Sequence, residues 1–120
     1  MHVVVNKRST KAGVGIISQK DMAITQFLFM GLPMWLPEMF GIVGSYEQFD
    51  AYNHFWRLIG YMLGTEDRFN ACGETVEETQ SRLQSIAEDM LLPAWKDPYP
   101  ECLPYAKITF DGVWTGTPTA

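Results

Sequence analysis

The most regular pattern of hydrophobic and polar positions lies between Ser45 and Gly64. Apolar and aromatic residues recur there at spacings of three and four, which predicts one stripe of an amphipathic helix. The stripe consists of Phe49, Tyr52, Trp56, Ile59 and Leu63. Ser45 and Gln48 form a capping box at the start, and Gly64 stands where a left-handed cap is expected. The pattern therefore predicts a helix that begins after Ser45 and ends before Gly64.

A second amphipathic helix is predicted from Thr75 to about Leu92. Thr75 and Glu78 make its capping box, and Pro93 is expected to end it because proline cannot continue a helix. The positions expected to face inward are Val76, Thr79, Leu83, Ile86 and Met90.

A further helix is predicted over residues 19–35, and it is apolar on nearly every side from Met22 onward. Ser18 and Asp21 resemble a capping box in which aspartate replaces the usual glutamate or glutamine. Pro33 is expected to kink this helix and Pro37 to stop it. A helix without a polar face is buried or lies in lipid, and this run is shorter than the ~18 apolar residues of a membrane span. We expect a buried helix, with an interfacial helix as the alternative.

The remaining segments carry weaker patterns. Residues 1–17 combine a β-branched patch with a basic loop that contains glycine, and residues 93–105 form an irregular loop with four prolines. The tail, residues 106–120, suits a short helix or a strand, and both alternatives stay open. No internal repeat is evident. The sequence therefore predicts an all-α fold, a helical bundle with three defined helices.

Composition and charge narrow the classes of function. The chain has 120 residues, of which 47% are apolar and 13% aromatic, so it suits one compact domain. Its net charge is −5 and its isoelectric point is about 4.9. No basic field runs along the chain that could neutralise the phosphates of a nucleic acid, so we expect no nucleic-acid partner. Three helices are few for so much apolar surface, and we expect a fragment of a larger helical domain.

The cysteines and the N-terminus bear on localisation. Cys72 and Cys102 lie far apart, without a CxxC motif or a neighbouring histidine, which indicates unpaired thiols in a reducing compartment. The N-terminal stretch MHVVVNKRSTK has too short an apolar run for a signal peptide. We expect no transmembrane span, and an intracellular or endoplasmic-reticulum-associated protein rather than a secreted one.

The common hydrolase, nucleotide-binding and metalloprotease motifs do not occur in the sequence. Candidates for a catalytic or binding role therefore have to be considered residue by residue, and His54 is one of them. It shares a predicted helix face with Asp50, Arg57 and Tyr61. In one interpretation His54 bonds to Asp50, and Arg57 makes an exposed ion pair. In the other, His54, Arg57 and Tyr61 line a pocket in which Arg57 meets a carboxylate in fork geometry. Asp50 and His54 alone supply too few ligands for a metal site.

Gln26 is a polar residue in apolar surroundings. A buried side-chain amide needs hydrogen-bond partners. Gln26 is therefore expected either to bond a neighbouring helix or to face a cavity, and both alternatives stay open.

Three stretches of the sequence carry a further signal: GVGIISQKDMAITQFLFMGL, YNHFWRLIGYMLGTEDRFN and LLPAW. Together they resemble the rubber oxygenase/MpaB catalytic domain family, whose members include bacterial latex-clearing proteins, the fungal endoplasmic-reticulum oxygenase MpaB and animal proteins. Over these stretches, the animal-type members of the family are the most similar in amino-acid sequence. The resemblance covers residues 1–95, a partial catalytic domain, and residues 96–120 match only weakly.

The resemblance implies a haem-b protein with a globin-like helical core that uses dioxygen to cleave carbon–carbon double bonds of isoprenoid chains. His2 stands at the position of the proximal ligand, which binds the haem iron in this family. The arginine three residues before that histidine, and the helix with the distal lysine and threonine, have no counterpart in this sequence. No catalytic residue is therefore assigned, and the resemblance also points to a truncated domain.

An elongated apolar cavity follows from the same resemblance. Phe27, Met30 and Trp56 would line it, and an apolar small molecule such as a polyprenyl chain would fill it. The polar side chains of His54, Arg57 and Tyr61 would belong to the pocket or lie beside the haem propionates.

The expected function is that of a fragment of a haem-b-dependent oxygenase acting on an apolar, isoprenoid-like substrate. The alternative is a helical module that binds a membrane or a partner without catalysis. Membrane association of the full-length protein is compatible with both.

Overall fold

The structure is a computed structural model that describes the backbone of residues 2–116 and the side chains of residues 4–108, 111 and 112. Every regular element in these residues is a helix or a helical turn, which confirms the predicted all-α class. The chain divides into two compact units, residues 1–87 and residues 88–120.

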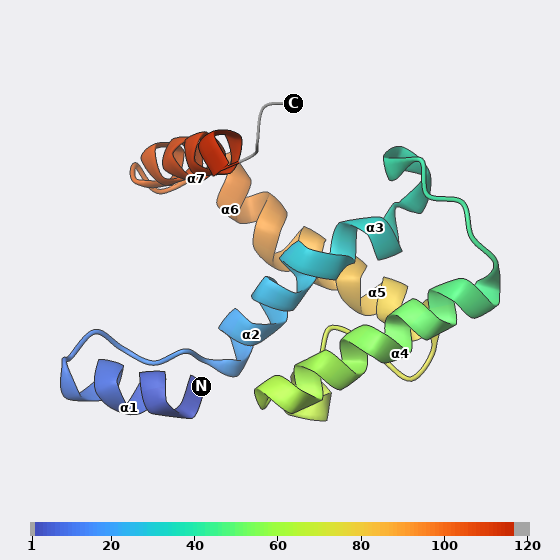
Figure 1. Ribbon diagram of the computed structural model, residues 1–120, viewed down its shortest axis with the longest axis horizontal. Coiled ribbons are helices and arrows are strands. Elements are labelled where there is room, and N and C mark those ends of the chain that lie inside the picture. Colours follow the sequence, from blue (N-terminus) through green and yellow to red (C-terminus); the bar gives the residue numbers. More distant parts are fainter. Residues whose placement is uncertain (1, 117–120) are drawn as a thin grey trace. The chain divides into compact units, whose positions relative to one another are not determined.

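The first unit contains the helices that build the candidate site (Figure 1). Its elements are α1 (His2–Lys11), α2 (Gln19–Gln26), η1 (Phe27–Gly31), α3 (Leu32–Trp35), η2 (Pro37–Phe40), α4 (Tyr46–Leu63), η3 (Asp67–Phe69) and α5 (Val76–Ile86). η1 is a π-helical turn, whereas η2 and η3 are 3-10 turns. The π-helical turn η4 (Ala87–Leu91) contains the boundary between the units, and α6 (Leu92–Lys96) and α7 (Cys102–Gly116) follow it.

The helix predicted between Ser45 and Gly64 is confirmed as α4. At its start, Gln48 Oε1 accepts a hydrogen bond of 2.9 Å from the backbone N–H of Ser45, as in a capping box. At its end, Gly64 has a φ of 93°, a left-handed conformation that favours glycine. Its N–H bonds to the carbonyls of Gly60 and Tyr61 and closes the last turn.

The helix predicted over residues 19–35 is also confirmed, as α2, η1 and α3 in direct succession. Asp21 and Ser18 cap it reciprocally: the Asp21 N–H donates to Ser18 Oγ at 3.2 Å, and the Ser18 N–H donates to Asp21 Oδ2 at 2.8 Å. The helix ends at Trp35, two residues before Pro37, as expected. The π turn η1 in its middle was not predicted.

The predicted end of the third helix at Pro93 is wrong. α5 begins at Val76, directly after its cap Thr75, but η4 and α6 continue the helical backbone to Lys96. In a π turn each N–H bonds five residues back instead of four. Pro93 comes just after this change of register, where the ladder of four-residue bonds is already interrupted. Its missing N–H therefore disrupts less than it would inside a regular α-helix.

The same local arrangement occurs twice in the chain, although the sequence showed no evident repeat. The π turn η1 is followed by LPMW at residues 32–35, and the π turn η4 is followed by LPAW at residues 92–95. In each case the π turn ends two residues before the proline. We infer that each proline is accommodated by the widened turn that precedes it.

Residues 2–11 form α1, where a β-branched patch and a basic loop were expected, and Arg8 and Lys11 lie in its last turn, where positive charge interacts favourably with the negative end of the helix dipole. Residues 102–116 form α7, which agrees with the helix that was one of the two alternatives left open for the tail. Pro104 lies in its first turn, where proline is tolerated. The irregular loop is thereby shortened to residues 97–101. Residues 117–120 lie outside the described part of the chain.

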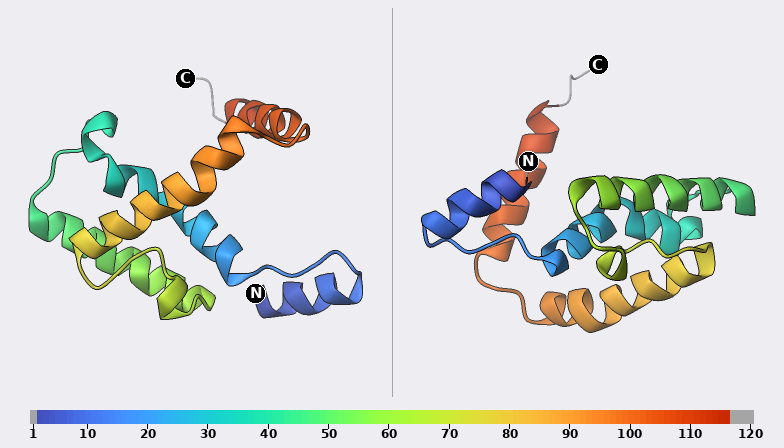
Figure 2. Two further views of the ribbon diagram at one scale, coloured as in Figure 1. Left: turned by 180° about the vertical axis from the view of Figure 1, so that it is seen from behind. Right: turned by 90° about the horizontal axis from the view of Figure 1, so that it is seen from below.

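The core of the first unit lies where the helix of residues 19–35 meets α5 and α4 (Figures 1 and 2). One face of that helix, together with α5 and the segment before it, supplies fully or nearly fully buried side chains. They include Phe27, Met30, Met34, Cys72, Val76, Thr79 and Leu83. On the other face Leu28 and Phe29 are 60% and 68% exposed. The expected burial is thus correct for one face of this helix and wrong for the other.

Candidate functional site

An open apolar groove lies between the helix of residues 19–35 and the last turns of α4. Its volume is about 550 Å³, within the range of small-molecule sites. Apolar side chains and a few polar ones line it. They are Ile17, Asp21, Met22, Thr25, Gln26, Phe29, Trp56, Ile59, Gly60, Leu63 and Thr65. The predicted stripe of α4 therefore faces this groove with its C-terminal half.

Aromatic rings form part of the groove wall. The rings of Phe29 and Trp56 are stacked, with centroids 6.2 Å apart and planes inclined by 22°. Tyr52 and Phe55 meet Trp56 edge-on, at 6.3 and 5.7 Å. Phe29 belongs to the π turn η1. The backbone of this turn therefore determines the position of the Phe29 ring in the groove wall.

The Gln26 side chain joins the groove to the polar interior. Its Nε2 donates to the Trp56 carbonyl at 2.8 Å and to Asn70 Oδ1 at 3.0 Å, and its Oε1 accepts from the Ala71 N–H at 3.0 Å. Gln26 therefore bonds a neighbouring helix and also lines the groove. The two alternatives left open by the sequence both hold.

The Asn70 side chain fixes the segment between α4 and α5 against α2 and α4. Its Nδ2 donates to the Arg57 carbonyl at 3.0 Å, and its Oδ1 accepts from the Cys72 N–H at 3.0 Å. Gly60 of α4 allows this approach: a Cβ atom there would lie 2.7 Å from Asn70 Nδ2 and 3.0 Å from Gln26 Nε2. A side chain at this position would displace the amides from α4.

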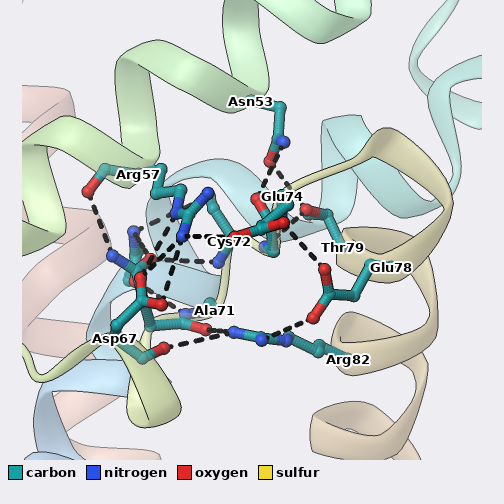
Figure 3. A network of polar contacts seen from close by, with 12 residues as sticks. Asn53, Arg57, Asp67, Ala71, Cys72, Glu74, Glu78, Thr79 and Arg82 are labelled. Atoms are coloured by element: carbon teal, nitrogen blue, oxygen red, sulfur yellow. Dashed lines mark hydrogen bonds and ion pairs between the residues drawn. The ribbon is translucent and has the colours of Figure 1, made fainter.

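A second buried cluster holds the other end of the same segment (Figure 3). Thr79 Oγ1 donates to Asn53 Oδ1 at 2.7 Å and accepts from the Gly73 N–H at 2.8 Å. Asn53 Nδ2 donates to the Gly73 carbonyl at 3.2 Å. Among the described residues no buried side-chain nitrogen or oxygen lacks a hydrogen-bond partner. Satisfied networks of this kind favour one conformation of the segment.

Charged side chains surround the segment at the surface (Figure 3). Arg57 Nη2 lies 2.9 and 3.1 Å from the two carboxylate oxygens of Asp67, and this hydrogen bonding raises the pKa of Arg57. Arg82 Nη2 donates to Glu78 Oε1 at 2.6 Å and its Nη1 to the Asn70 carbonyl at 2.7 Å. The pKa of Glu78 is lowered by the hydrogen bond from the Glu74 N–H and by that from Arg82.

The sequence-predicted site residues lie in different places. His54 and Tyr61 are exposed on α4, and neither belongs to the groove lining. The fork geometry expected of Arg57 is present, but its carboxylate is that of Asp67 in the same chain. His2 begins α1, and its side chain lies outside the described part of the chain.

The residues expected to line an apolar cavity separate in the structure. Trp56 lines the groove, whereas Phe27 and Met30 are buried in the core and Phe29 lines the groove instead. The cause is helical geometry, because residues 27 and 30 share the face that meets α5, and residue 29 lies on another face.

Sequence patterns assigned no site role to the polar residues that fix the segment after α4, above all Asn53, Asn70 and Thr79. Asn53 lies between the apolar stripe and the polar face of α4, and periodicity alone gave no reason to select it. One available signal was Thr79, a polar residue within the predicted inward stripe of α5. A buried hydroxyl requires a partner, which identifies the neighbourhood of Thr79 as a polar contact.

The two cysteines have opposite environments. Cys72 is buried and Cys102 is exposed, and both are free thiols. Burial raises the pKa of the Cys72 thiol to about 12. Among the described side chains no group of three or more His, Cys, Asp or Glu residues could hold a metal ion.

A second, smaller groove of about 370 Å³ lies between the N-terminal half of α4 and α3. Its lining is Pro33, Ile42, Val43, Gly44, Gln48, Phe49 and Tyr52. It has no charged residue, and Gln48 and Tyr52 are the side chains in its lining that carry polar atoms.

Comparisons with family models, with curated proteins and with solved structures found no match to this chain. None of the helices in the described part of the chain has the length and apolar character needed to cross a membrane.

Proposed function

We propose that this chain is part of a haem-dependent oxygenase and that the groove between α2 and α4 receives the porphyrin or the apolar substrate beside it. The support comes from the resemblance of the two long sequence stretches and from the groove itself. Most of its lining is apolar, and Phe29 and Trp56 present stacked rings to it. Flat aromatic walls suit a large, flat apolar ligand.

The fit of haem to the described residues depends on an axial ligand. Among the described residues that line the groove there is one thioether, Met22, and no imidazole, thiol or phenol. Haem iron is commonly held by a histidine. In this proposal the histidine is His2, at the position that the family resemblance assigns to the proximal ligand.

One observation carries the proposal for His2. Asn6 of α1 holds Ile17, a residue of the groove lining, through two hydrogen bonds: Ile17 N–H to Asn6 Oδ1 at 2.6 Å and Asn6 Nδ2 to the Ile17 carbonyl at 3.0 Å. Positions 2 and 6 are one helical turn apart and share a face of α1. The same face that contacts the groove segment therefore carries position 2.

The roles of this chain's own residues follow from the site. Phe29 and Trp56 would orient a flat ligand, and Gln26 would keep the floor rigid because all its polar atoms are already bonded. Bound haem would supply the activation of dioxygen. A globin-like arrangement of the helices, with the groove as its haem crevice, belongs to this proposal.

The test is a titration of the purified chain with haemin, followed by visible absorption. We expect a Soret band that saturates at one haem per chain and that His2→Ala removes or shifts. His54→Ala is the matched control, since His54 is exposed and lies outside the groove. A band that survives His2→Ala and is lost in His54→Ala would show that the wrong ligand was chosen. Absence of a specific band would contradict the proposal for this chain.

A second candidate function is binding of a membrane or a partner chain without catalysis. The observation that favours it is the exposure of Leu28 and Phe29 on a helix whose other large apolar side chains are buried or partly buried. Leu28→Ser combined with Phe29→Ser should abolish such binding. If haem binding is specific and this double variant leaves all association unchanged, the second candidate is excluded.

A further inference from the structure

The two helices that flank the groove run in opposite directions. At one end Gln19, in the first turn of α2, donates from Nε2 to the carbonyl of Gly64 at the end of α4, at 3.0 Å. Farther along, Gln26 Nε2 donates to the Trp56 carbonyl at 2.8 Å. The start of α2 therefore lies beside the end of α4, and the end of α2 lies beside the middle of α4.

This alignment gives the groove one polar end and one aromatic end. Asp21 lines the polar end, and Thr25 lines the groove one helical turn farther along the same face of α2. The stacked rings of Phe29 and Trp56 form the aromatic end. From position 21 to position 29 the helical backbone rises by about 12 Å, which is the length of an extended chain of about ten carbon atoms.

Asp21 is the charged residue of this groove. Among the described residues that line the groove there is no lysine, arginine or histidine. The N–H and the hydroxyl of Ser18 both donate to Asp21 Oδ2, each at 2.8 Å. None of the hydrogen bonds found among the described residues goes to the other carboxylate oxygen, Oδ1. The pKa of Asp21 is lowered, first by the bond from the Ser18 N–H and then by that from the hydroxyl, so the carboxylate is ionised at neutral pH.

The charges around this end favour a cation over an anion. The negative end of the α4 dipole lies there. The positive end of α2 opposes it, but α2 is the shorter helix and Asp21 in its first turn offsets that charge. Lys20 is exposed and lies outside the lining, and none of the ion pairs among the described residues joins it to Asp21. A carboxylate or diphosphate head group would therefore meet Asp21 without a cation in the groove to bind it.

We propose that the groove binds aliphatic amines with a single chain, with the protonated amine at Asp21 and the chain extending to the rings of Phe29 and Trp56. The amine would donate to Asp21 Oδ1 in a charge-assisted hydrogen bond. This proposal rests on the proposed function in taking the groove as the site of the apolar ligand, and it assigns the groove to that ligand and not to the porphyrin. It requires no haem.

The test is isothermal titration calorimetry of the full chain at pH near 7 with decylamine, decanoate and decanol, each below the concentration at which it forms micelles. Decylamine is protonated at this pH, because an alkylamine has a pKa of about 10. We expect one decylamine to bind per chain, about tenfold more tightly than decanoate, because Asp21 attracts the first head group and repels the second. Decanol should bind with an affinity between the two.

Three variants separate the contribution of the head group from that of the chain. Asp21→Asn keeps an oxygen that can accept from Ser18 and should lower the affinity for decylamine to that for decanol. Asp50→Asn is the matched control: it removes the same charge from an exposed residue of α4 outside the groove lining, and the preference for decylamine should remain. Phe29→Ser alters an exposed side chain and should weaken all three ligands by the same factor. Circular dichroism shows whether each variant keeps its helices.

Three outcomes would overturn the proposal. Equal affinities for decylamine and decanoate would show that the groove does not select the head group. Equal loss in Asp21→Asn and Asp50→Asn would show a general attraction of cations to an acidic chain. A preference for decylamine that survives in Asp21→Asn would place the amine elsewhere, for example against the ring of Trp56. The haemin titration tests the proposed function separately: selective amine binding without a Soret band contradicts the haem assignment alone, and a Soret band without amine selectivity contradicts this inference alone.

Discussion

Gln26 Nε2 of α2 donates a buried hydrogen bond of 3.0 Å to Asn70 Oδ1, across 44 residues of sequence. This contact lies at the point where the groove floor meets the segment between α4 and α5. The same Gln26 side chain accepts from the Ala71 N–H, so one amide ties a core helix to a connecting segment. The rigidity of that segment therefore depends on a residue far away in the sequence.

Gln26→Leu should destabilise the fold. The substitution leaves the buried N–H of Ala71 without its acceptor, and an unsatisfied buried group costs about 1–3 kcal/mol. We expect the free energy of unfolding in urea to fall by about 2 kcal/mol. The control is Gln19→Leu, because Gln19 bonds Gly64 and Glu66 at an exposed position. If both variants lose the same free energy, the buried network has no special role.

Gly60→Ala should also destabilise, although alanine favours helices over glycine by up to ~1 kcal/mol. The added Cβ would lie 2.7 Å from Asn70 Nδ2, and overpacking of this kind costs about 1–3 kcal/mol. Thermal unfolding followed by circular dichroism measures the net effect. Gly112→Ala in α7 is the control, since a Cβ there meets no atom within 4 Å, and it should raise helix content. A higher melting temperature for Gly60→Ala would contradict the close approach of the amides.

Glu78 makes a pH-dependent contribution that can be isolated. Its folded-state pKa is lowered from 4.5, first by the hydrogen bond from the Glu74 N–H and then by Arg82. The stabilisation is therefore present above pH 4.5 and is lost as the pH falls through the lower folded-state value. We expect the stability gap between the unaltered chain and Glu78→Gln to be open at neutral pH and to close on acidification.

A double-mutant cycle with Arg82→Gln separates the two causes of this shift. In the Arg82→Gln background the effect of Glu78→Gln should be smaller, because the ion pair is already gone and only the contact with Glu74 remains. Identical effects in both backgrounds would mean that Arg82 contributes nothing to the charged state of Glu78.

Much of the fold could be predicted from local signals. The caps Ser18, Ser45 and Thr75 mark helix starts because their side chains satisfy backbone N–H groups that the helix leaves unpaired. Pro93 misled the prediction because a local rule about proline takes no account of a π turn before it. α1 was missed because its exposed stripe is basic, and a search for apolar periodicity does not detect such a helix.

The candidate site was harder to predict, for a physical reason. Periodicity identified Trp56 and the stripe of α4 but could not tell a groove wall from a core face, since both are apolar. Gln26 meets Asn70, and Asn53 meets Thr79, only because the chain folds back on itself after Gly64. Spacing along the sequence does not carry that information. His54 and Tyr61 were selected by their chemistry, yet they lie on the exposed side of α4.

The two thiols should react at very different rates. Cys102 is exposed, whereas Cys72 is buried with a pKa raised to about 12, and only the thiolate is a good nucleophile. At pH near 8 we expect a disulfide reagent to label one thiol per native chain rapidly and the second only after unfolding in urea. Cys102→Ser should remove the rapid phase. A rapid phase that persists in this variant would show that Cys72 is accessible in the native state.

The raised pKa of Cys72 also predicts how stability changes at alkaline pH. The main cause is burial, which disfavours the thiolate in the folded state, while the unfolded chain titrates near the ordinary value of 9.0. Between these two values the unfolded state has lost its proton and the folded state has kept it, so the free energy of unfolding falls as the pH rises. Below pH 9.0 this contribution is fully present. Cys72→Ala removes the titrating group, and the decline in its stability above that pH should be less steep than that of the unaltered chain. Equal slopes for the two proteins would mean that Cys72 is not held as a buried neutral thiol.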